Sequence, residues 1–192
     1  MTVSAEGIQR LMDEAAIQSD PACAETSLKE AIRLAGDANL QRLEAEALLA
    51  LGRLIRRVGP ARDGEALGYL HRALELGVQS AGVRQHHAVL FELGLHGLQS
   101  SDLPAALSFL HEAEQLSRSN GMDPELADVL ETMGAVHYTM GQFETALEYD
   151  RQALDFDIQH IADVEACDLD RLPAFETERW LRFDGEKGVT AS

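Results

Sequence analysis

Three sets of small and apolar residues repeat along this chain at almost the same interval. Two sets are spaced by 40 residues throughout, and the third is spaced by 42 and then 40 residues. They are the pairs Ala66-Leu67, Ala106-Leu107 and Ala146-Leu147; the alanines Ala73, Ala113 and Ala153; and the pairs Leu51-Gly52, Leu93-Gly94 and Met133-Gly134. A fixed period of about 20–50 residues is typical of stacked structural repeats. The sequence therefore predicts one supersecondary unit that is copied along the chain.

The clearest copy of this unit spans residues 126–157. It contains two amphipathic helical patterns that are separated at Gly141-Gln142. Gly134 lies inside the first pattern, where glycine costs about 1 kcal/mol relative to alanine. We therefore expect the two helices to press together at their small residues, which are Gly134 and Ala135 on the first and Ala146 and Ala153 on the second. A fainter fourth copy opens the chain, at Ile8, Leu11, Met12, Ala24, Leu28 and Ala31.

This pattern resembles the tetratricopeptide repeat. That repeat has a bulky residue three positions before a Leu-Gly pair, a tyrosine-like residue three positions after the glycine, and an alanine-rich second helix. The matching positions are Leu130, Met133-Gly134, His137 and Ala146; Leu90, Leu93-Gly94, Gly97 and Ala106; and Leu48, Leu51-Gly52, Ile55 and Ala66. No copy has the signature tryptophan or the closing proline. The period exceeds the usual 34 residues, as in the longer-helix variant of kinesin-light-chain-like and bacterial regulatory proteins.

The resemblance covers about residues 5–158 and implies an all-α fold. The expected architecture is a right-handed solenoid of antiparallel helix pairs, with about four repeats and a C-terminal capping helix. Capping residues, prolines and apolar spacing predict helices over residues 4–17, 21–35, 40–58, 63 onward, 83–99, 102–120, 123–140 and up to about 158. Residues 1–158 would form the repeats, residues 159–184 capping or self-docking helices, and residues 185–192 a flexible tail.

Aromatic residues gather beyond the last repeat. Phe175, Trp180, Leu181 and Phe183 lie within nine residues of one another. Because the last repeat of an array exposes an apolar face, we interpret this segment as a cap on that face, around Phe143, Leu147 and Leu154. The alternative is that the segment occupies the apolar middle of the binding groove, around Phe91 and Leu98.

Composition and charge limit the kind of protein. Hydrophobic residues make up 45% of the 192 residues, which is too many for a disordered chain. The absence of a long apolar run and of a signal-peptide pattern predicts a cytoplasmic protein. The net charge of −17 disfavours nucleic acid and anionic membranes as partners. Cys23 and Cys167 match no disulfide framework or metal-binding spacing.

The sequence contains no motif for catalysis or for a bound cofactor. It has no glycine-rich phosphate loop, no HExxH and no GxSxG. The seven histidines are scattered, and adjacent His86 and His87 point to different parts of a helix surface. We therefore expect no enzyme activity, no cofactor and no metal ion.

In tetratricopeptide arrays the first helix of each pair lines a concave groove, which implies that a protein or peptide segment binds there. Helical spacing predicts which residues form its three exposed faces. They are Glu46, Leu49, Arg53, Arg56 and Arg57 on the third helix; Ala88, Phe91, Leu95, Leu98 and Gln99 on the fifth; and Asp128, Glu131, Ala135, Tyr138 and Thr139 on the seventh. The predicted groove is basic at one end, apolar in the middle and acidic at the other.

Each part of this groove has a simpler alternative. The arginines would be neutralised by Glu46 or Glu92. Phe91, Leu95 and Leu98 would belong to the core. Members of the family that bind chaperone tails use a clamp of lysine and asparagine side chains on these faces. This chain has no matching set, which argues against that ligand.

We interpret the chain as a non-catalytic scaffold that binds a protein or peptide segment in the groove, with an acidic group of the partner facing the arginines. One alternative is a sensory or self-associating module of a bacterial-type regulatory protein, whose ends contact a second copy. Another alternative is an enzyme or small-ligand receptor whose pocket is the groove.

Overall fold

The computed structural model describes residues 4–80 and 82–168, and this part of the chain is entirely helical apart from its turns. The helices are α1 (Ala5–Ile17), α2 (Pro21–Asp37), α3 (Gln41–Val58), α4 (Asp63–Ser80), α5 (Val83–Gln99), α6 (Leu103–Asn120), α7 (Asp123–Thr139) and α8 (Phe143–Asp168), with a short 3₁₀ helix η1 (Pro60–Arg62) before α4.

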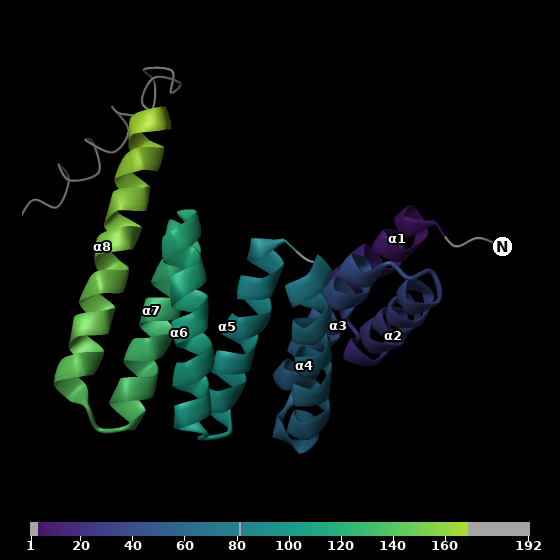
Figure 1. Ribbon diagram of the computed structural model, residues 1–192, viewed down its shortest axis with the longest axis horizontal. Helices are drawn as coiled ribbons and strands as arrows, with labels where there is room; N and C mark the ends of the chain where they lie inside the picture. The colour runs from purple at the N-terminus through teal and green to yellow at the C-terminus, as the bar shows by residue number, and fades with distance from the viewer. Residues whose placement is uncertain (1–3, 81, 169–192) are drawn as a thin grey trace, which may run out of the picture.

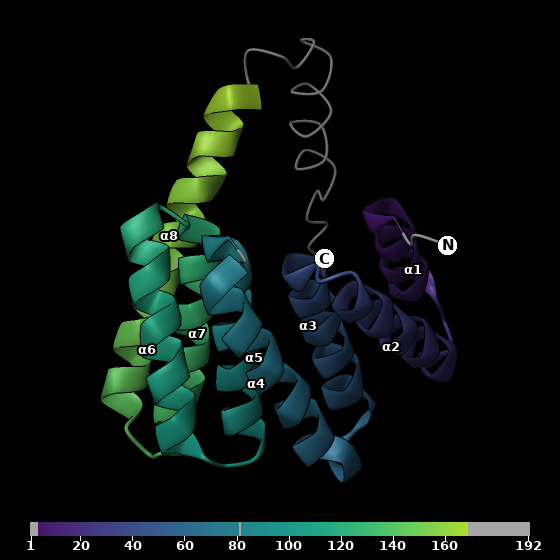
Figure 2. The same cartoon turned by 45° about the vertical axis from the view of Figure 1, so that its right-hand side comes forward.

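The helices form a row of antiparallel pairs: α1/α2, α3/α4, α5/α6 and α7/α8 (Figure 1). Each helix packs on the helices that precede and follow it in the sequence. The α1/α2 pair and α8 lie at opposite ends of the row, and Figure 2 shows the same order from a second direction. The predicted all-α solenoid of helix pairs is confirmed.

Side-chain caps and prolines set several of the helix starts. The carboxylate of Asp20 accepts a hydrogen bond from the Ala22 N–H at 3.1 Å, and Pro21 takes the first position of α2, where a missing N–H costs nothing. Asp102 caps α6 in the same way, through the Ala105 N–H at 3.2 Å. The expected cap at Asp123 is wrong, because α7 begins at Asp123 itself and its preceding residue, Met122, makes no side-chain cap.

The repeated alanines and glycines lie where the two helices of a pair cross. Ala66, Ala106 and Ala146 are buried, as are Ala73, Ala113 and Ala153. A Cβ atom added to Gly94 would lie 2.6 Å from the Leu110 side chain, and one added to Gly52 would lie 2.8 Å from the Leu70 side chain. One added to Gly134 would lie 3.3 Å from the Ala146 carbonyl oxygen. The predicted close approach at Gly134 and Ala146 is therefore confirmed, but Ala135 is exposed, so its predicted place at the crossing is wrong.

Two predicted helix ends are wrong. The second helix passes Gly36 and ends at Asp37, with Ala38 as its C-cap. The eighth helix does not end near Ile158 but continues to Asp168, because residues 143–168 contain no glycine or proline to end it. The predicted boundary between repeats and cap therefore falls inside α8. The aromatic segment with Phe175, Trp180, Leu181 and Phe183 lies outside the described residues.

None of the helices in residues 4–80 and 82–168 combines the length and the hydropathy that a crossing of the bilayer requires.

Candidate protein-binding surfaces

The arginines predicted to line the groove lie near the C-terminal end of α3, and two of them contact α5. Arg53 Nε donates to Glu92 Oε1 at 2.7 Å, and Arg56 Nη2 donates to Glu92 Oε2 at 2.8 Å. The Glu92 carboxylate is buried, and the Arg56 side chain is only 13% exposed. Glu46 instead contacts Arg42, with 3.5 Å between Glu46 Oε1 and Arg42 Nη1. Of the two neutralising partners considered, Glu92 is therefore the one that the arginines bind, and this ion pair ties the second helix pair to the third.

Arg57 is different from its two neighbours. Its side chain is exposed and forms no ion pair or hydrogen bond within residues 4–80 and 82–168. The other cations of α3, Arg42, Arg53 and Arg56, each contact a carboxylate. Arg57 is therefore the cation of this helix that is available to a partner.

A hollow of about 640 Å³ lies beside Arg57, between α1, the α1–α2 turn, α2 and the C-terminal half of α3. Aliphatic side chains form most of its wall, and among the described residues Arg53 and Arg57 are the only charged ones that line it. The lining residues are Met12, Ala15, Ala16, Gln18, Ser19, Pro21, Ala24, Leu28, Ala50, Arg53, Leu54, Arg57 and Val58. We call this feature the N-terminal hollow. Ile17 and Val58, which are largely exposed, lie at the ends of α1 and α3 that border it.

The middle of the predicted groove is less open than helical spacing suggested. Leu49 is only 6% exposed and belongs to a core cluster with Leu48, Leu70 and Val89, so its place in an exposed groove is wrong. The reason is that α3 packs against α2, α4 and α5, and a helix with neighbours on several sides buries more than one stripe.

The apolar side chains of α5 in this region are half-buried. Phe91 and Leu98 pack against the core cluster of α5, α6 and α7, and Ala88 packs against the cluster of α3, α4 and α5. Leu95 is also half-buried. These residues support the core and leave only part of their surface to a ligand.

The acidic end of the predicted groove is exposed. Asp128 and Glu131 of α7 face solvent, and Tyr138 is 65% exposed. The Tyr138 ring meets the Phe143 ring edge to face, with 5.2 Å between centroids, across the turn from α7 to α8. Further large apolar side chains continue from this point along α8. We call Tyr138, Met140, Phe143, Leu147 and Leu154, all more than 40% exposed, the C-terminal tip.

Sequence reasoning identified part of each surface. It found the arginines, but it missed the apolar wall that α1 and α2 contribute to the N-terminal hollow. Four alanines, Ala15, Ala16, Ala24 and Ala50, line the hollow, but alanines are equally consistent with tight packing, so the sequence held no signal that distinguishes the two. It also named Phe143, Leu147 and Leu154 as apolar, but assigned them to the face beneath a cap.

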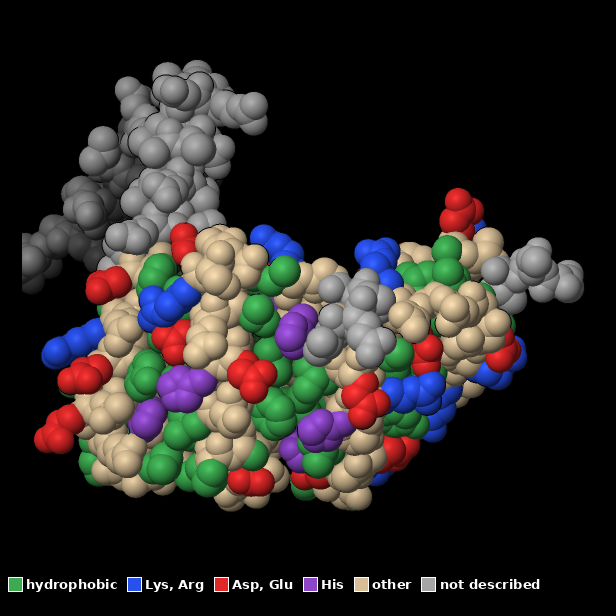
Figure 3. All heavy atoms as spheres, viewed as in Figure 1, with side chains coloured by type: hydrophobic (Ala, Val, Ile, Leu, Met, Phe, Trp, Pro, Cys, Tyr) green, Lys and Arg blue, Asp and Glu red, His purple; other side chains and the backbone are tan. Residues whose placement is uncertain are grey.

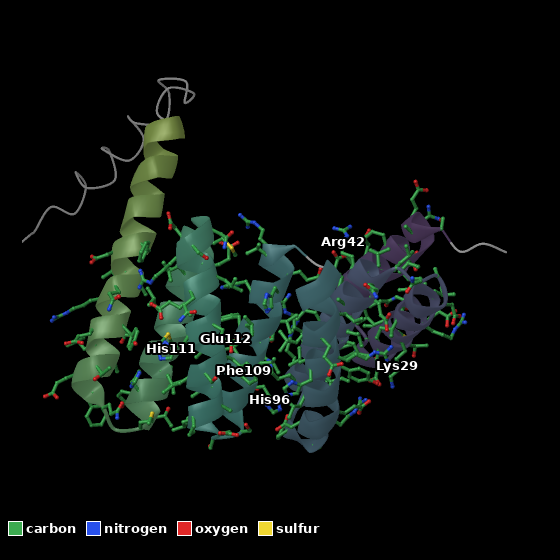
Figure 4. The ribbon with its side chains drawn as sticks, in the orientation of Figure 1. Lys29, Arg42, His96, Phe109, His111 and Glu112 are labelled. Carbon is green, nitrogen blue, oxygen red and sulfur yellow. The ribbon has the colours of Figure 1, made fainter. Side chains whose placement is uncertain are left out.

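The histidines form no common site in the described part of the chain. Figure 4 shows His96 on α5 and His111 on α6 as separate side chains, with Phe109 nearby. His96 Nε2 lies 3.3 Å from the Asp63 carbonyl oxygen, and His111 Nδ1 lies 3.4 Å from Glu114 Oε2. Burial lowers the pKa of His87, which favours its neutral form. No group of three metal-binding side chains occurs within residues 4–80 and 82–168.

The outer surface changes character along the row. In Figure 3, hydrophobic and histidine side chains gather over the middle of the visible face, and several carboxylates project at the edge where α8 lies. Residues 4–62 contain nine acidic and eight basic side chains, whereas residues 123–156 contain eight acidic side chains and one basic one. The negative charge of the described chain is therefore concentrated in its last helix pair.

Comparisons with known proteins agree with a helical repeat. No protein-family model matches the chain. The CTR9 homolog of Arabidopsis thaliana is 36% identical over 109 residues, which make up 57% of this chain but 9% of that protein. The crystal structure of BtubC (BKLC) from P. vanneervenii is similar with a TM-score of 0.72 and 17% identity, over 80% of this chain and 64% of that chain. The chain thus spans less than two-thirds of either protein, and together they support a tetratricopeptide-like helical repeat.

Proposed function

We propose that this chain is a non-catalytic protein-interaction scaffold whose N-terminal hollow receives an apolar side chain from an acidic segment of a partner protein. The observation that carries the proposal is the charge of the hollow. In a chain with a net charge of −17, its only charged lining residues are Arg53 and Arg57, and Arg57 has no carboxylate partner within the described residues.

The hollow has the size and wall of a side-chain pocket. Its volume of about 640 Å³ falls in the range of about 300–1,000 Å³ that is typical of ligand pockets. An apolar group placed there would displace water from Met12, Leu28 and Leu54, and burial contributes about 25 cal/mol per Å² of apolar surface. A carboxylate beside that group would then lie next to Arg57. Apolar burial would supply most of the affinity, and charge would select the partner and speed its approach.

A basic or neutral partner fits the hollow less well. A lysine or arginine side chain there would face Arg57, which has no carboxylate partner within the described residues, and this is unfavourable by Coulomb repulsion. A tightly bound small ligand is also less well matched, because Gln18 and Ser19, the uncharged polar residues among the described lining, are exposed rather than buried. The wall instead suits one side chain of a longer segment.

Titration with two labelled peptides tests this function. Both carry one phenylalanine, flanked by glutamates in the first peptide and by lysines in the second. We expect fluorescence anisotropy to show binding of the first peptide only, weakening as salt rises because exposed charges are screened within about 10 Å at 0.1 M salt.

Two substitutions locate the peptide on the protein. Arg57→Glu should weaken binding of the acidic peptide, whereas Arg10→Glu should not, because Arg10 is exposed and unpaired on α1 but does not line the hollow. Equal affinity for the two peptides, or equal effects of the two substitutions, would contradict the proposal. A thermal-shift screen with small metabolites separates a small-ligand receptor from a scaffold, since only the receptor would gain stability.

A further inference from the structure

The C-terminal tip is a second apolar surface, at the opposite end of the row from the N-terminal hollow. It holds five of the eight large apolar side chains that are exposed in the described residues, and two more, Ile17 and Val58, border the hollow. The edge-to-face contact between Tyr138 and Phe143 joins the end of α7 to the start of α8. The tip therefore presents a projecting aromatic pair that is 62–65% exposed.

The charges around the tip are opposite to those of the hollow. Glu144 and Glu148 lie on the same exposed part of α8 as Phe143 and Leu147, and neither forms an ion pair within residues 4–80 and 82–168. The tip combines exposed apolar groups with the carboxylates of Glu144 and Glu148, and Arg151, the one basic residue within 123–156, lies between Leu147 and Leu154 on the same helix. The hollow carries Arg57.

We propose that the hollow of one copy of this chain receives the tip of a second copy, with Phe143 against the aliphatic wall and Glu144 facing Arg57. This inference rests on the proposed function, because it names the partner of the same hollow. The helices that carry the two surfaces, α1–α3 and α7–α8, lie at opposite ends of the row (Figures 1 and 2), so one copy does not bring its own tip to its own hollow. A contact between two different surfaces leaves one of each free in a dimer, so further copies add head to tail unless a ring closes.

Pairing of two tips is disfavoured by charge. It would bring together two helix pairs that each carry eight acidic side chains and one basic one in residues 123–156. Like charges placed opposite one another repel. A tip-to-hollow contact buries the same apolar groups but places carboxylates beside arginines.

Sedimentation of the full chain over a range of concentration and salt tests the proposal. We expect oligomers that grow past the dimer as concentration rises and that dissociate in high salt.

Phe143→Ser should weaken self-association by about tenfold or more, as expected for a central aromatic anchor. Arg57→Glu should weaken it by about two- to fivefold or more, since a charge is reversed rather than removed. Val83→Ser and Arg10→Glu are the matched controls and should have no effect, because both residues are exposed away from the two surfaces.

A mixture of the Arg57→Glu and Phe143→Ser variants tests whether the tip of one copy binds the hollow of another. The Arg57→Glu copy keeps an intact tip and the Phe143→Ser copy keeps an intact hollow, so the two variants should bind one another more tightly than either binds itself, and an equal mixture should be enriched in the heterodimer. Reversing both charges, Arg57→Glu with Glu144→Arg, should restore growth. A tip-to-tip dimer would persist in Arg57→Glu alone and would overturn the proposal.

Two further outcomes would contradict the proposal that the hollow binds the tip of a second copy. If the wild type stays monomeric while the glutamate-flanked peptide still binds the hollow, the second copy is the wrong partner and the scaffold proposal stands; if neither binds, both fall. If Phe143→Ser shifts the emission of Trp180 in monomeric protein, the chain's own C-terminal segment covers the tip, and the proposal is wrong.

Discussion

Gly94 of α5 lies directly against Leu110 of α6, so closely that a methyl group on Gly94 would come within 2.6 Å of the leucine side chain. The same relationship joins Gly52 of α3 to Leu70 of α4. Gly52 lies 42 positions before Gly94, and Leu70 lies 40 positions before Leu110. The glycine thus defines the separation of the two helices in a pair. A periodic glycine in the sequence marks a helix crossing in space.

Substitution of Gly94 with alanine should destabilise the protein. Alanine has a helix propensity about 1 kcal/mol better than glycine, but the clash with Leu110 forces the helices apart, at a typical cost of about 1–3 kcal/mol. Gly68→Ala is the control, because Gly68 lies inside α4 with no atom within 4 Å of an added Cβ. Urea unfolding should show a loss for Gly94→Ala and a gain for Gly68→Ala. A gain in both variants would mean that the crossing is looser than described.

Enlargement of Ala146 should have a similar effect in the last helix pair. Ala146 is buried at the crossing with Gly134, so Ala146→Leu is expected to cost about 1–3 kcal/mol by overpacking. Ala135→Leu adds the same bulk to an exposed position of α7 and should leave stability within about 0.5 kcal/mol. Thermal unfolding measures both changes. An unchanged melting temperature for Ala146→Leu would contradict the repeat register.

Neutralisation of Glu92 should loosen the junction between the second and third helix pairs. Glu92→Gln removes the carboxylate that Arg53 and Arg56 share and leaves the largely buried Arg56 guanidinium without its anion. The expected loss is about 1.5–3 kcal/mol, the usual value for hydrogen bonds to charged groups. The exposed pair Glu30–Arg33 provides the control, since Glu30→Gln should cost about 0.2–1 kcal/mol. Equal losses in urea unfolding would show that burial of Glu92 has no energetic consequence.

Glu25 should contribute to stability in a defined range of pH. Hydrogen bonds from Arg62 and Lys29 lower the pKa of Glu25 from 4.5 to about 2. Because the folded form binds its proton more weakly than the unfolded form, the contribution is complete above pH 4.5 and disappears as the pH falls towards 2. The difference in melting temperature between the wild type and Glu25→Gln should follow this curve. A difference that stays constant down to pH 2 would contradict the assigned ion pairs.

Local rules in the sequence predicted the helices well and the surfaces only in part. Periodicity placed Ala106, Ala146 and Gly134 at their crossings, because close packing of two helices tolerates only small residues there. Whether Leu49 is exposed depends on how many neighbours surround α3, and helical spacing within one segment does not contain that information. Pairing of Arg53 and Arg56 with Glu92, 36 to 39 positions away, likewise depends on the stacking of pairs.

The N-terminal hollow was beyond the reach of pattern analysis for a related reason. It exists because α1, α2 and α3 leave space beside several alanines. A sequence pattern describes the residues of one segment and not the gaps between packed helices. The same alanines would be equally consistent with tight packing. By contrast, the exposure of Phe143 follows from its place on the last helix of the row, which the repeat pattern predicted.

Glu92 also acts on the mechanics of the molecule. Its ion pairs with Arg53 and Arg56 bridge α3 and α5, at the midpoint of the four pairs, and in a repeat array each pair is held mainly by its neighbours. A rotation at this junction would displace α8, at the far end of the row, more than it displaces α5. Because ionic strength screens the half-exposed Arg53 contact more than the largely buried Arg56 contact, we expect salt to loosen the packing between the second and third pairs before it affects the packing within each pair.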